Sequence, residues 1–326
     1  MIMKKWSLFV LIFTCMLVIS ACGSKDTDKQ ADESSSTTQE GAESTEIKIQ
    51  HELDDQEVVL NKVPEKIVVL DFGVLDTLDS LGIEVAGVPQ NVVPEYLKKY
   101  AGSEYTSVGS LVEPDFEAID GMKPDLIIIG DRQAEMYDEF TGIAPTVYMS
   151  VDFTNYMDSF TDNMETIANI FNKEEQIDKE LTEINEKVDA IQEKTKDLDA
   201  KTLIVMVNEG KISAYGPGSR YGGFIHDVAG YKAVDENIEK AKFGQTINFE
   251  YITEKNPDII FVVDRSAVLN TAHDSTKEMF ENELVKRTNA YKNDHIIYLD
   301  TEAWFYGGGL QSSKKMIEDT NAYWKE

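Results

Sequence analysis

The chain has 326 residues, of which 42% are hydrophobic, so it is long enough for two domains with cores of their own. Its 60 acidic residues outnumber its 31 basic residues, and the formal net charge is −29. This balance excludes nucleic acid as a partner, because phosphate binding requires a basic face. It also gives little attraction to an anionic lipid surface.

The N-terminus predicts a secretory signal. Lys4 and Lys5 precede an apolar run over residues 8–19, and Ile19-Ser20-Ala21-Cys22 follows. A plain transmembrane anchor is the alternative, but the run is short for a span of ~20 residues. The ending resembles the bacterial lipobox. That resemblance implies removal of residues 1–21, lipid attachment to the sulfur of Cys22, a mature charge of −31 and no cysteine pair for a disulfide.

Residues 22–46 are almost free of apolar side chains and predict a disordered tether. Residues 47–172 then predict an N-terminal α/β lobe. Apolar runs at 58–60, 67–70, 85–88 and 146–149 indicate strands, and leucine spacing at 74–81 indicates a helix. Strands that alternate with helices predict a mainly parallel sheet.

A long helix is predicted in the middle of the chain. After a helical stretch at 156–171, apolar residues recur every three or four positions from Ile177 to Ile191, which indicates one helix from about Lys173 to Lys196. A coiled coil is the competing interpretation, but three heptads without clear charge pairing support it weakly. We expect this segment, 173–198, to join the N-terminal lobe to a C-terminal α/β lobe at 199–326.

The C-terminal lobe begins with a strand at 202–207 and a glycine-dense loop at 216–223. A helix at about 276–284, a strand at 296–299, a loop at 301–309 and a terminal helix complete it. The predicted fold class is therefore α/β, with two Rossmann-like lobes of mainly parallel sheet joined by one long helix.

One motif occurs twice, at a constant offset of 133 residues. Phe116-Glu117-x-Ile119, Pro124-Asp125 and Asp131-Arg132 return as Phe249-Glu250-x-Ile252, Pro257-Asp258 and Asp264-Arg265. Each copy predicts a short helix, a turn, a buried strand and an arginine at the carboxyl end of that strand. Ligands bind at this edge of open α/β sheets.

Arginine is rare, with four residues against 27 lysines, yet three of the four stand in these special places. Arg132 and Arg265 end the repeated strands, and Arg220 lies in the glycine-dense loop. The planar guanidinium suits oxyanions and aromatic faces. We therefore expect these three residues to form an anion site; the alternative is that Arg132 and Arg265 pair with Asp131 and Asp264 at the surface.

The sequence gives little indication of metal binding or catalysis. The four histidines, at 51, 226, 273 and 295, have no zinc-type spacing, and His226 is expected to be packed or capping. No nucleophile elbow or phosphate loop is present. Glu117 and Glu250 start the two repeated helices, where the helix dipole favours a carboxylate; the functional alternative is one acidic knob per lobe for a two-fold partner.

The whole of this pattern resembles the ferric-siderophore-binding proteins of ATP-binding-cassette importers, in the class whose lobes are joined by one long helix. Within that class it is most similar to catecholate (petrobactin-type) binding lipoproteins of Gram-positive bacteria. The resemblance runs from Ile47 to the end of the chain. Its specific stretches are 71–78, 109–116, 211–222 and 256–265.

The resemblance implies a substrate-binding protein rather than an enzyme, without a cofactor, whose transported ligand is a ferric siderophore. It assigns Arg132, Arg220 and Arg265 to the anionic iron–catecholate complex, and Glu117 and Glu250 to a dimeric permease. The expected protein is a monomer, held outside the cell membrane by lipid on Cys22.

The same resemblance places further ligand contacts at Tyr221, Lys242, Phe243, Trp304, Phe305 and Tyr306. Some members of the family bind iron through a histidine and a tyrosine, but here Phe243 and Phe305 stand at those positions. Neither can ligate iron, although Tyr306 follows directly. The pattern thus favours six-coordinate complexes. Haem, a ferric citrate or a hydroxamate complex is the alternative ligand, and a surface-anchored hydrolase is the remote alternative.

Overall fold

A computed structural model describes residues 46–268 and 276–324. The predicted signal, the lipidation residue Cys22 and nearly all of the predicted tether lie outside the described residues, as does His273. The chain from Ser44 onward clusters as one unit. Its described residues form two five-stranded sheets and a two-stranded hairpin, β1 (Ile47–His51) with β2 (Asp54–Leu60).

The N-terminal sheet is wholly parallel, in the order β5-β4-β3-β6-β7. Its strands β3, β6 and β7 are buried over their full length, as parallel strands covered on both faces are. Around them lie α1, α2, α3 and two 3₁₀ helices, η1 and η2. The bounds are β3 (Ile67–Val69), α1 (Phe72–Ser80), β4 (Gly87–Val88), η1 (Glu95–Ala101), β5 (Thr106–Ser107), α2 (Phe116–Met122), β6 (Leu126–Ile129), η2 (Asp131–Met136), α3 (Tyr137–Thr141) and β7 (Thr146–Tyr148).

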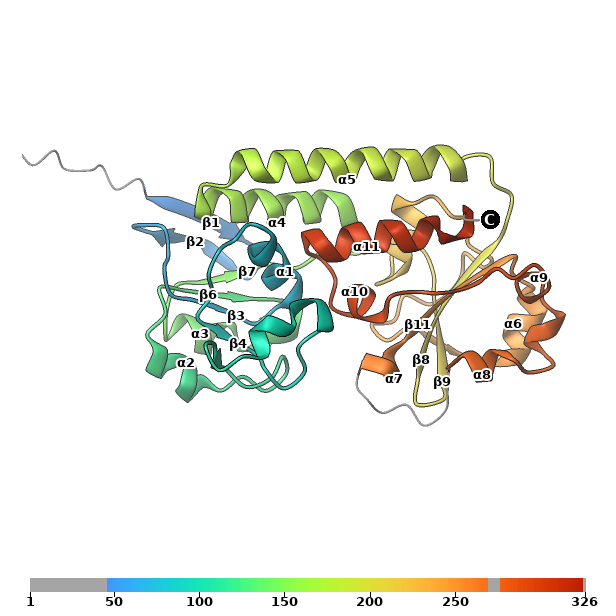
Figure 1. The fold of residues 1–326 in the computed structure, drawn as a ribbon, viewed down its shortest axis with the longest axis horizontal. Helices are drawn as coiled ribbons and strands as arrows, with labels where there is room; N and C mark the ends of the chain where they lie inside the picture. Colours follow the sequence, from blue (N-terminus) through green and yellow to red (C-terminus); the bar gives the residue numbers. More distant parts are fainter. Residues whose placement is uncertain (1–45, 269–275, 325–326) are drawn as a thin grey trace, which may run out of the picture. The chain divides into compact units, whose positions relative to one another are not determined.

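The predicted long helix is present as α5 (Glu174–Thr195), preceded by α4 (Tyr156–Phe171). The side chains of the predicted stripe, from Ile177 to Ile191, are all buried. In Figure 1, α5 runs above α4 and the N-terminal sheet and continues over the C-terminal part of the chain. The helix therefore connects the two lobes as a continuous rod rather than a loop.

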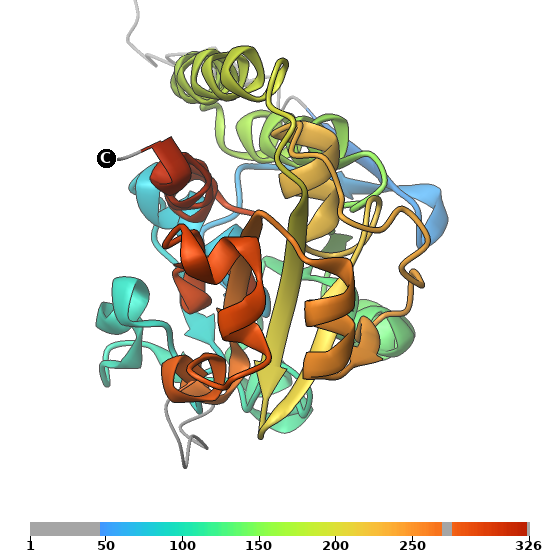
Figure 2. The ribbon, with the colours of Figure 1, turned by 90° about the vertical axis from the view of Figure 1, so that its right-hand side faces the viewer.

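The C-terminal sheet is mixed, in the order β10-β9-β8-β11-β12. Strands β8, β11 and β12 are parallel, whereas β9 pairs antiparallel with both β8 and β10. Figure 2, turned to face this lobe, shows helices on both sides of its strands. The bounds are β8 (Thr202–Asn208), β9 (Lys211–Tyr215), the π-helix η3 (Gly223–Val228), β10 (Gln245–Ile247), α6 (Phe249–Lys255), β11 (Ile259–Asp264), α7 (Arg265–Val268), α8 (Thr276–Phe280), η4 (Val285–Arg287), α9 (Asn289–Lys292), β12 (Ile296–Tyr298), α10 (Thr301–Phe305), α11 (Leu310–Thr320) and η5 (Asn321–Trp324).

The two copies of the repeat fold alike. Asp115 caps α2, and Asn248, 133 residues later, caps α6; each side-chain oxygen accepts a backbone N–H at 2.9 Å. Asp125 and Asp258 each accept, also at 2.9 Å, the backbone N–H of the residue that precedes the lobe's first parallel strand. The sequence repeat is thus a repeat of helix cap, turn and strand, and it places Arg132 and Arg265 at equivalent strand ends.

Two predicted elements differ from the structure. The helix expected at 276–284 stops at Phe280, because the Asn282 side chain accepts the N–H groups of Leu284 and Val285 and starts a new turn. The loop expected at 301–309 begins instead with α10, since Asp300 caps a helical turn. Both differences come from side-chain caps that outweigh local composition.

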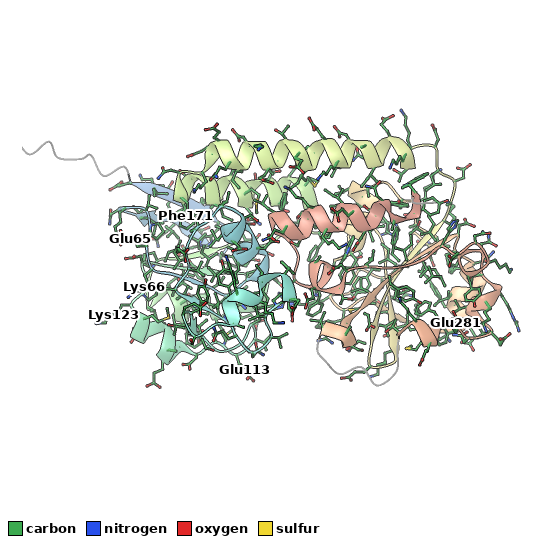
Figure 3. All side chains as sticks on the ribbon, viewed as in Figure 1. Glu65, Lys66, Glu113, Lys123, Phe171 and Glu281 are labelled. Atoms are coloured by element: carbon green, nitrogen blue, oxygen red, sulfur yellow. The ribbon has the colours of Figure 1, made fainter. Side chains whose placement is uncertain are left out.

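A second connection joins the lobes beside α5. The N-terminus of α11 points at α1, and the Asp76 carboxylate accepts the backbone N–H groups of Gln311 and Ser312, both at 2.7 Å. Burial raises the pKa of Asp76 to about 6, although these N–H groups favour its charged form. Figure 3 shows the side chains packed throughout this region and both lobes. Two packed connections favour small lobe movements over a wide hinge.

Candidate functional site

Three arginines reach the gap between the lobes from three different elements. Arg132 lies in the first turn of η2 just after β6, Arg265 opens α7 directly after β11, and Arg220 lies in the glycine-dense loop after β9. All three side chains are partly buried. Among described residues, neither Arg132 nor Arg265 forms an ion pair with the aspartate before it, and Asp131 pairs with Lys242 instead.

These arginines converge on one residue, Phe305. Their guanidinium carbons lie 5.7, 4.8 and 5.6 Å from the centre of the Phe305 ring, for Arg132, Arg220 and Arg265 respectively. The Phe305 carbonyl oxygen accepts an N–H of Arg220 at 2.6 Å and one of Arg132 at 3.4 Å. One phenylalanine thus contacts three cations, of which two are bound to its backbone.

The three guanidiniums concentrate positive charge around Phe305. Three groups at these distances from one point are at most about 11 Å apart, so each pair repels by at least ~1.5 kcal/mol at an effective dielectric of 20. Cation–π contacts of about 0.5–2 kcal/mol each and charged hydrogen bonds of about 1.5–3 kcal/mol offset this repulsion. Burial, followed by the charge of Arg220, lowers the pKa of Arg132 from its ordinary value, but a guanidinium stays charged. An anion would relieve the remaining repulsion.

One carboxylate accompanies the cations. Asp71, at the carboxyl end of β3, caps α1 by accepting the N–H groups of Gly73 and Val74 at 2.8 and 3.1 Å. Burial raises the pKa of Asp71 above its usual value, while Arg132 and Arg220 act in the opposite direction. With Asp71 ionised, the group carries two net positive charges rather than three.

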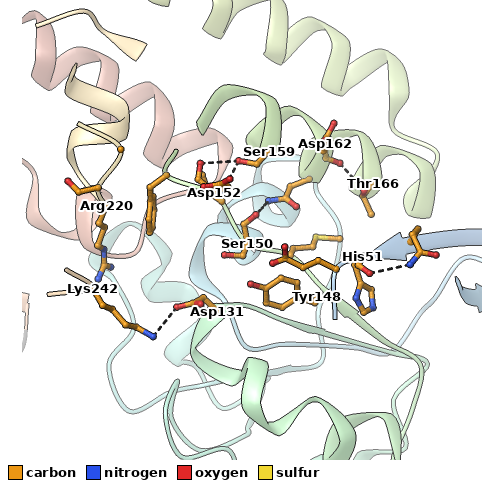
Figure 4. Close-up of a pocket in the computed structure, with 18 of the residues that line it drawn as sticks. His51, Asp131, Tyr148, Ser150, Asp152, Ser159, Asp162, Thr166, Arg220 and Lys242 are labelled. Carbon is orange, nitrogen blue, oxygen red and sulfur yellow. Dashed lines mark hydrogen bonds and ion pairs between the residues drawn. The ribbon is translucent and has the colours of Figure 1, made fainter. Parts of the chain in front are cut away.

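A cleft of about 400 Å³ opens onto the arginines. Its walls are mostly apolar or aromatic. They combine residues of both lobes with the three arginines, and include Met149, Phe153, Tyr156, Met206, Tyr215, Trp304 and Phe305. A second, more polar cavity of about 580 Å³ adjoins it and shares several lining residues with it, among them Asp131, Met149, Phe153, Arg220 and Lys242. Figure 4 shows this cavity, with the Lys242–Asp131 ion pair across it at 3.5 Å.

Seven of the nine predicted ligand contacts line the cleft: Arg132, Arg220, Arg265, Lys242, Phe243, Trp304 and Phe305. Phe243 stands at its margin with 71% of its surface exposed. Tyr221 and Tyr306 are buried and are absent from the cleft walls. Tyr306 packs edge-on against Phe72, and Tyr221 packs against Trp304. These two tyrosines support the cleft from behind.

The sequence reasoning missed several wall residues. Asp71 and Met149 follow the carboxyl ends of the parallel strands β3 and β7, and Tyr215 ends β9. Ligands bind at the carboxyl edge of parallel strands, and this rule, which located Arg132, would also have found Asp71 and Met149. Phe153 and Met206 carry no comparable signal, because an apolar residue in a wall has the same pattern as one in a core.

Metal-binding residues are not gathered in the described ranges, where no group of three His, Cys, Asp or Glu side chains could hold an ion. His226 is packed, as predicted: its Nδ1 bonds the Tyr231 carbonyl at 2.7 Å, and burial lowers the pKa of His226. No helix in ranges 46–268 and 276–324 has the length and apolar character to cross a membrane.

Glu117 and Glu250 occupy the same place in the first turn of α2 and α6. Both are exposed. Within the described part of the chain, neither side chain forms an ion pair or a hydrogen bond to a neighbour. Each carboxylate is therefore free to contact a partner.

Comparisons with known proteins agree with this architecture. Residues 67–303 match the periplasmic binding protein family. The petrobactin-binding protein YclQ of Bacillus subtilis is 45% identical over 320 residues, which cover 97% of this chain and 98% of YclQ. The ferric-anguibactin-binding protein FatB of Vibrio anguillarum is 35% identical over 280 residues, covering 84% of this chain and 86% of FatB.

Solved structures show the same fold. The crystal structure of YclQ matches with a TM-score of 0.83, covering 86% of this chain and 99% of that chain. The periplasmic catecholate-siderophore binding protein VctP of Vibrio cholerae matches with a TM-score of 0.81 at 34% identity, covering 85% of this chain and all of VctP (100%).

Proposed function

Because the chain belongs to the periplasmic binding protein family, whose members are transport proteins, we propose that it captures a ferric catecholate siderophore for an importer. The observation that carries the proposal is the convergence of Arg132, Arg220 and Arg265 on Phe305. A ferric ion bound by three catecholates carries three negative charges, which match three guanidiniums. The aromatic and methionine walls suit the catechol rings.

The residues at the cleft favour a complex whose siderophore already fills the coordination sphere of iron. Phe243 and Phe305 have no donor atoms, and Tyr306 lies behind the wall. Recognition would then depend on charge and ring packing rather than on a protein–iron bond. Arg132, Arg220 and Arg265 offset the negative charge of the complex, Lys242 stands at the cleft margin in an ion pair with Asp131, and Trp304 and Phe305 provide flat apolar surface.

The location and partners of the protein follow from the same function. Cys22 would carry the lipid that holds the protein, as a monomer, at the extracellular face of the membrane. Glu117 and Glu250, exposed at equivalent positions of the two lobes, would contact basic residues on the two halves of a permease dimer. Residues 22–46 would then tether the lobes 47–172 and 199–326, with 173–198 as the linking helix.

Titration of intrinsic fluorescence with a ligand panel tests the proposal. The panel contains a ferric tris-catecholate, haem, ferric citrate and a neutral ferric tris-hydroxamate. We expect the trianionic catecholate to bind most tightly, and the neutral hydroxamate at least ~100-fold more weakly, since it gains little from the arginines. Tighter binding of haem, citrate or hydroxamate would replace the proposed ligand with that one.

A further inference from the structure

Phe305 occupies an unusual position, because a single uncharged residue contacts every arginine of the site. Its carbonyl oxygen is at the end of α10, where the last carbonyls of a helix have no partner within the helix. Arg132 from the N-terminal lobe and Arg220 from the C-terminal lobe supply that partner. The centre of the ring lies within 5.7 Å of all three guanidinium carbons.

The neighbours of Phe305 fix it from both sides. Trp304 donates its indole N–H to Asp319 at 3.0 Å and packs edge-on against Phe224. Tyr306 packs edge-on against Phe72 of the other lobe and against Phe305 itself. With 9% of its surface exposed, Phe305 has little freedom to leave this place. The arginines thus contact a buried residue, whereas Phe243 at the cleft margin is 71% exposed.

We propose that Phe305 is the positioning residue of the arginine site, and that its ring, together with its carbonyl oxygen, holds the three guanidiniums in their binding arrangement before the ligand arrives. This inference rests on the proposed function, which it deepens. A site assembled in advance loses less side-chain freedom on binding, and preorganisation of this kind increases affinity. Because a phenyl ring is neither acidic nor a metal ligand, it organises the cations without neutralising them.

The first experiment needs no ligand. Since the chain has four arginines, the ¹⁵N spectrum of their side-chain Nε–H groups contains four assignable signals, and Arg287, exposed on η4, is the internal reference. We expect Arg132, Arg220 and Arg265 to be rigid and Arg287 mobile in the wild-type protein. Phe305→Leu removes the ring but keeps the carbonyl that accepts from Arg132 and Arg220, so it should make Arg265 mobile and loosen the other two less. Phe249→Leu, the same change on α6, should leave all three rigid. An Arg265 side chain that stays rigid in Phe305→Leu would overturn the proposal.

The second experiment measures affinity for a ferric tris-catecholate. Phe305→Leu should weaken binding ~10- to 30-fold by removing the cation–π contacts, and Phe305→Trp should restore most of it. In an Arg220→Ala background the same substitution should cost clearly less, because residues that act together are not additive. Additive effects, or an unchanged affinity in Phe305→Leu, would contradict positioning. A wild-type protein that binds no ferric catecholate would refute the proposed function instead, and the spectrum would still decide the role of Phe305.

Discussion

Replacing one site arginine has the most direct consequence for binding, and Arg220 is the best choice. Its guanidinium is 4.8 Å from the centre of the Phe305 ring and donates a 2.6 Å hydrogen bond to the Phe305 carbonyl. A trianionic complex resting on that ring would lie ~6 Å from the guanidinium, where each unit of its charge is attracted by ~3 kcal/mol at an effective dielectric of 20. Even if only one unit of the ligand's negative charge is attracted by this guanidinium, Arg220→Ala should weaken binding ~100-fold.

Fluorescence quenching by a ferric tris-catecholate measures this loss. Arg287→Ala is the matched control, because it removes the same side chain from an exposed position on η4 and should leave affinity unchanged. Arg132→Ala and Arg265→Ala should weaken binding comparably. An electrostatic role of the arginines is refuted if all three site variants bind the trianion within ~3-fold of the wild type. It is also refuted if the variants lose as much affinity for a neutral ferric tris-hydroxamate as for the trianion.

Three further predictions concern other parts of the molecule. Glu117→Ala combined with Glu250→Ala should abolish iron uptake by cells while the purified protein binds normally; unimpaired ⁵⁵Fe uptake would refute a docking role. Phe243→Ala should weaken catecholate binding ~2- to 10-fold, the worth of one aromatic contact, without changing the melting temperature. The folded-state pKa of Asp76 is raised from 3.8 to about 6, so its contribution to stability is present below pH 3.8 and is lost as pH rises through 6. Relative to Asp76→Asn, the wild type should lose up to ~3 kcal/mol of unfolding free energy between pH 4 and pH 7, and parallel urea-unfolding profiles would contradict this.

The sequence was most informative where it repeats itself. The 133-residue offset correctly predicted α2 and α6, β6 and β11, and an arginine after each strand, because caps, turns and buried strands depend on neighbouring residues. The stripe of α5 was equally clear, since its period matches a helix. Strand direction was less predictable: apolar runs do not distinguish parallel from antiparallel pairing, and β9 and β10 are antiparallel.

The organisation of the site could not be read from the chain. Arg132, Arg220 and Arg265 are far apart in sequence, and only folding brings them to Phe305. Phe305 was expected at the ligand because the family resemblance implies a ligand contact at its position; that it contacts every arginine had no sequence signal. The direction in which a side chain points could not be predicted either, since Phe305 lines the cleft while the adjacent Tyr306 is buried behind it. Such directions depend on tertiary packing.

A crystal structure of the protein with a ferric tris-catecholate tests the central claim most directly. We predict that the complex rests against Phe305, with all three arginines within hydrogen-bond distance of catecholate oxygens and no protein atom bound to iron. A complex seated instead in the polar cavity beside His51, or iron ligated by a protein side chain, would contradict it.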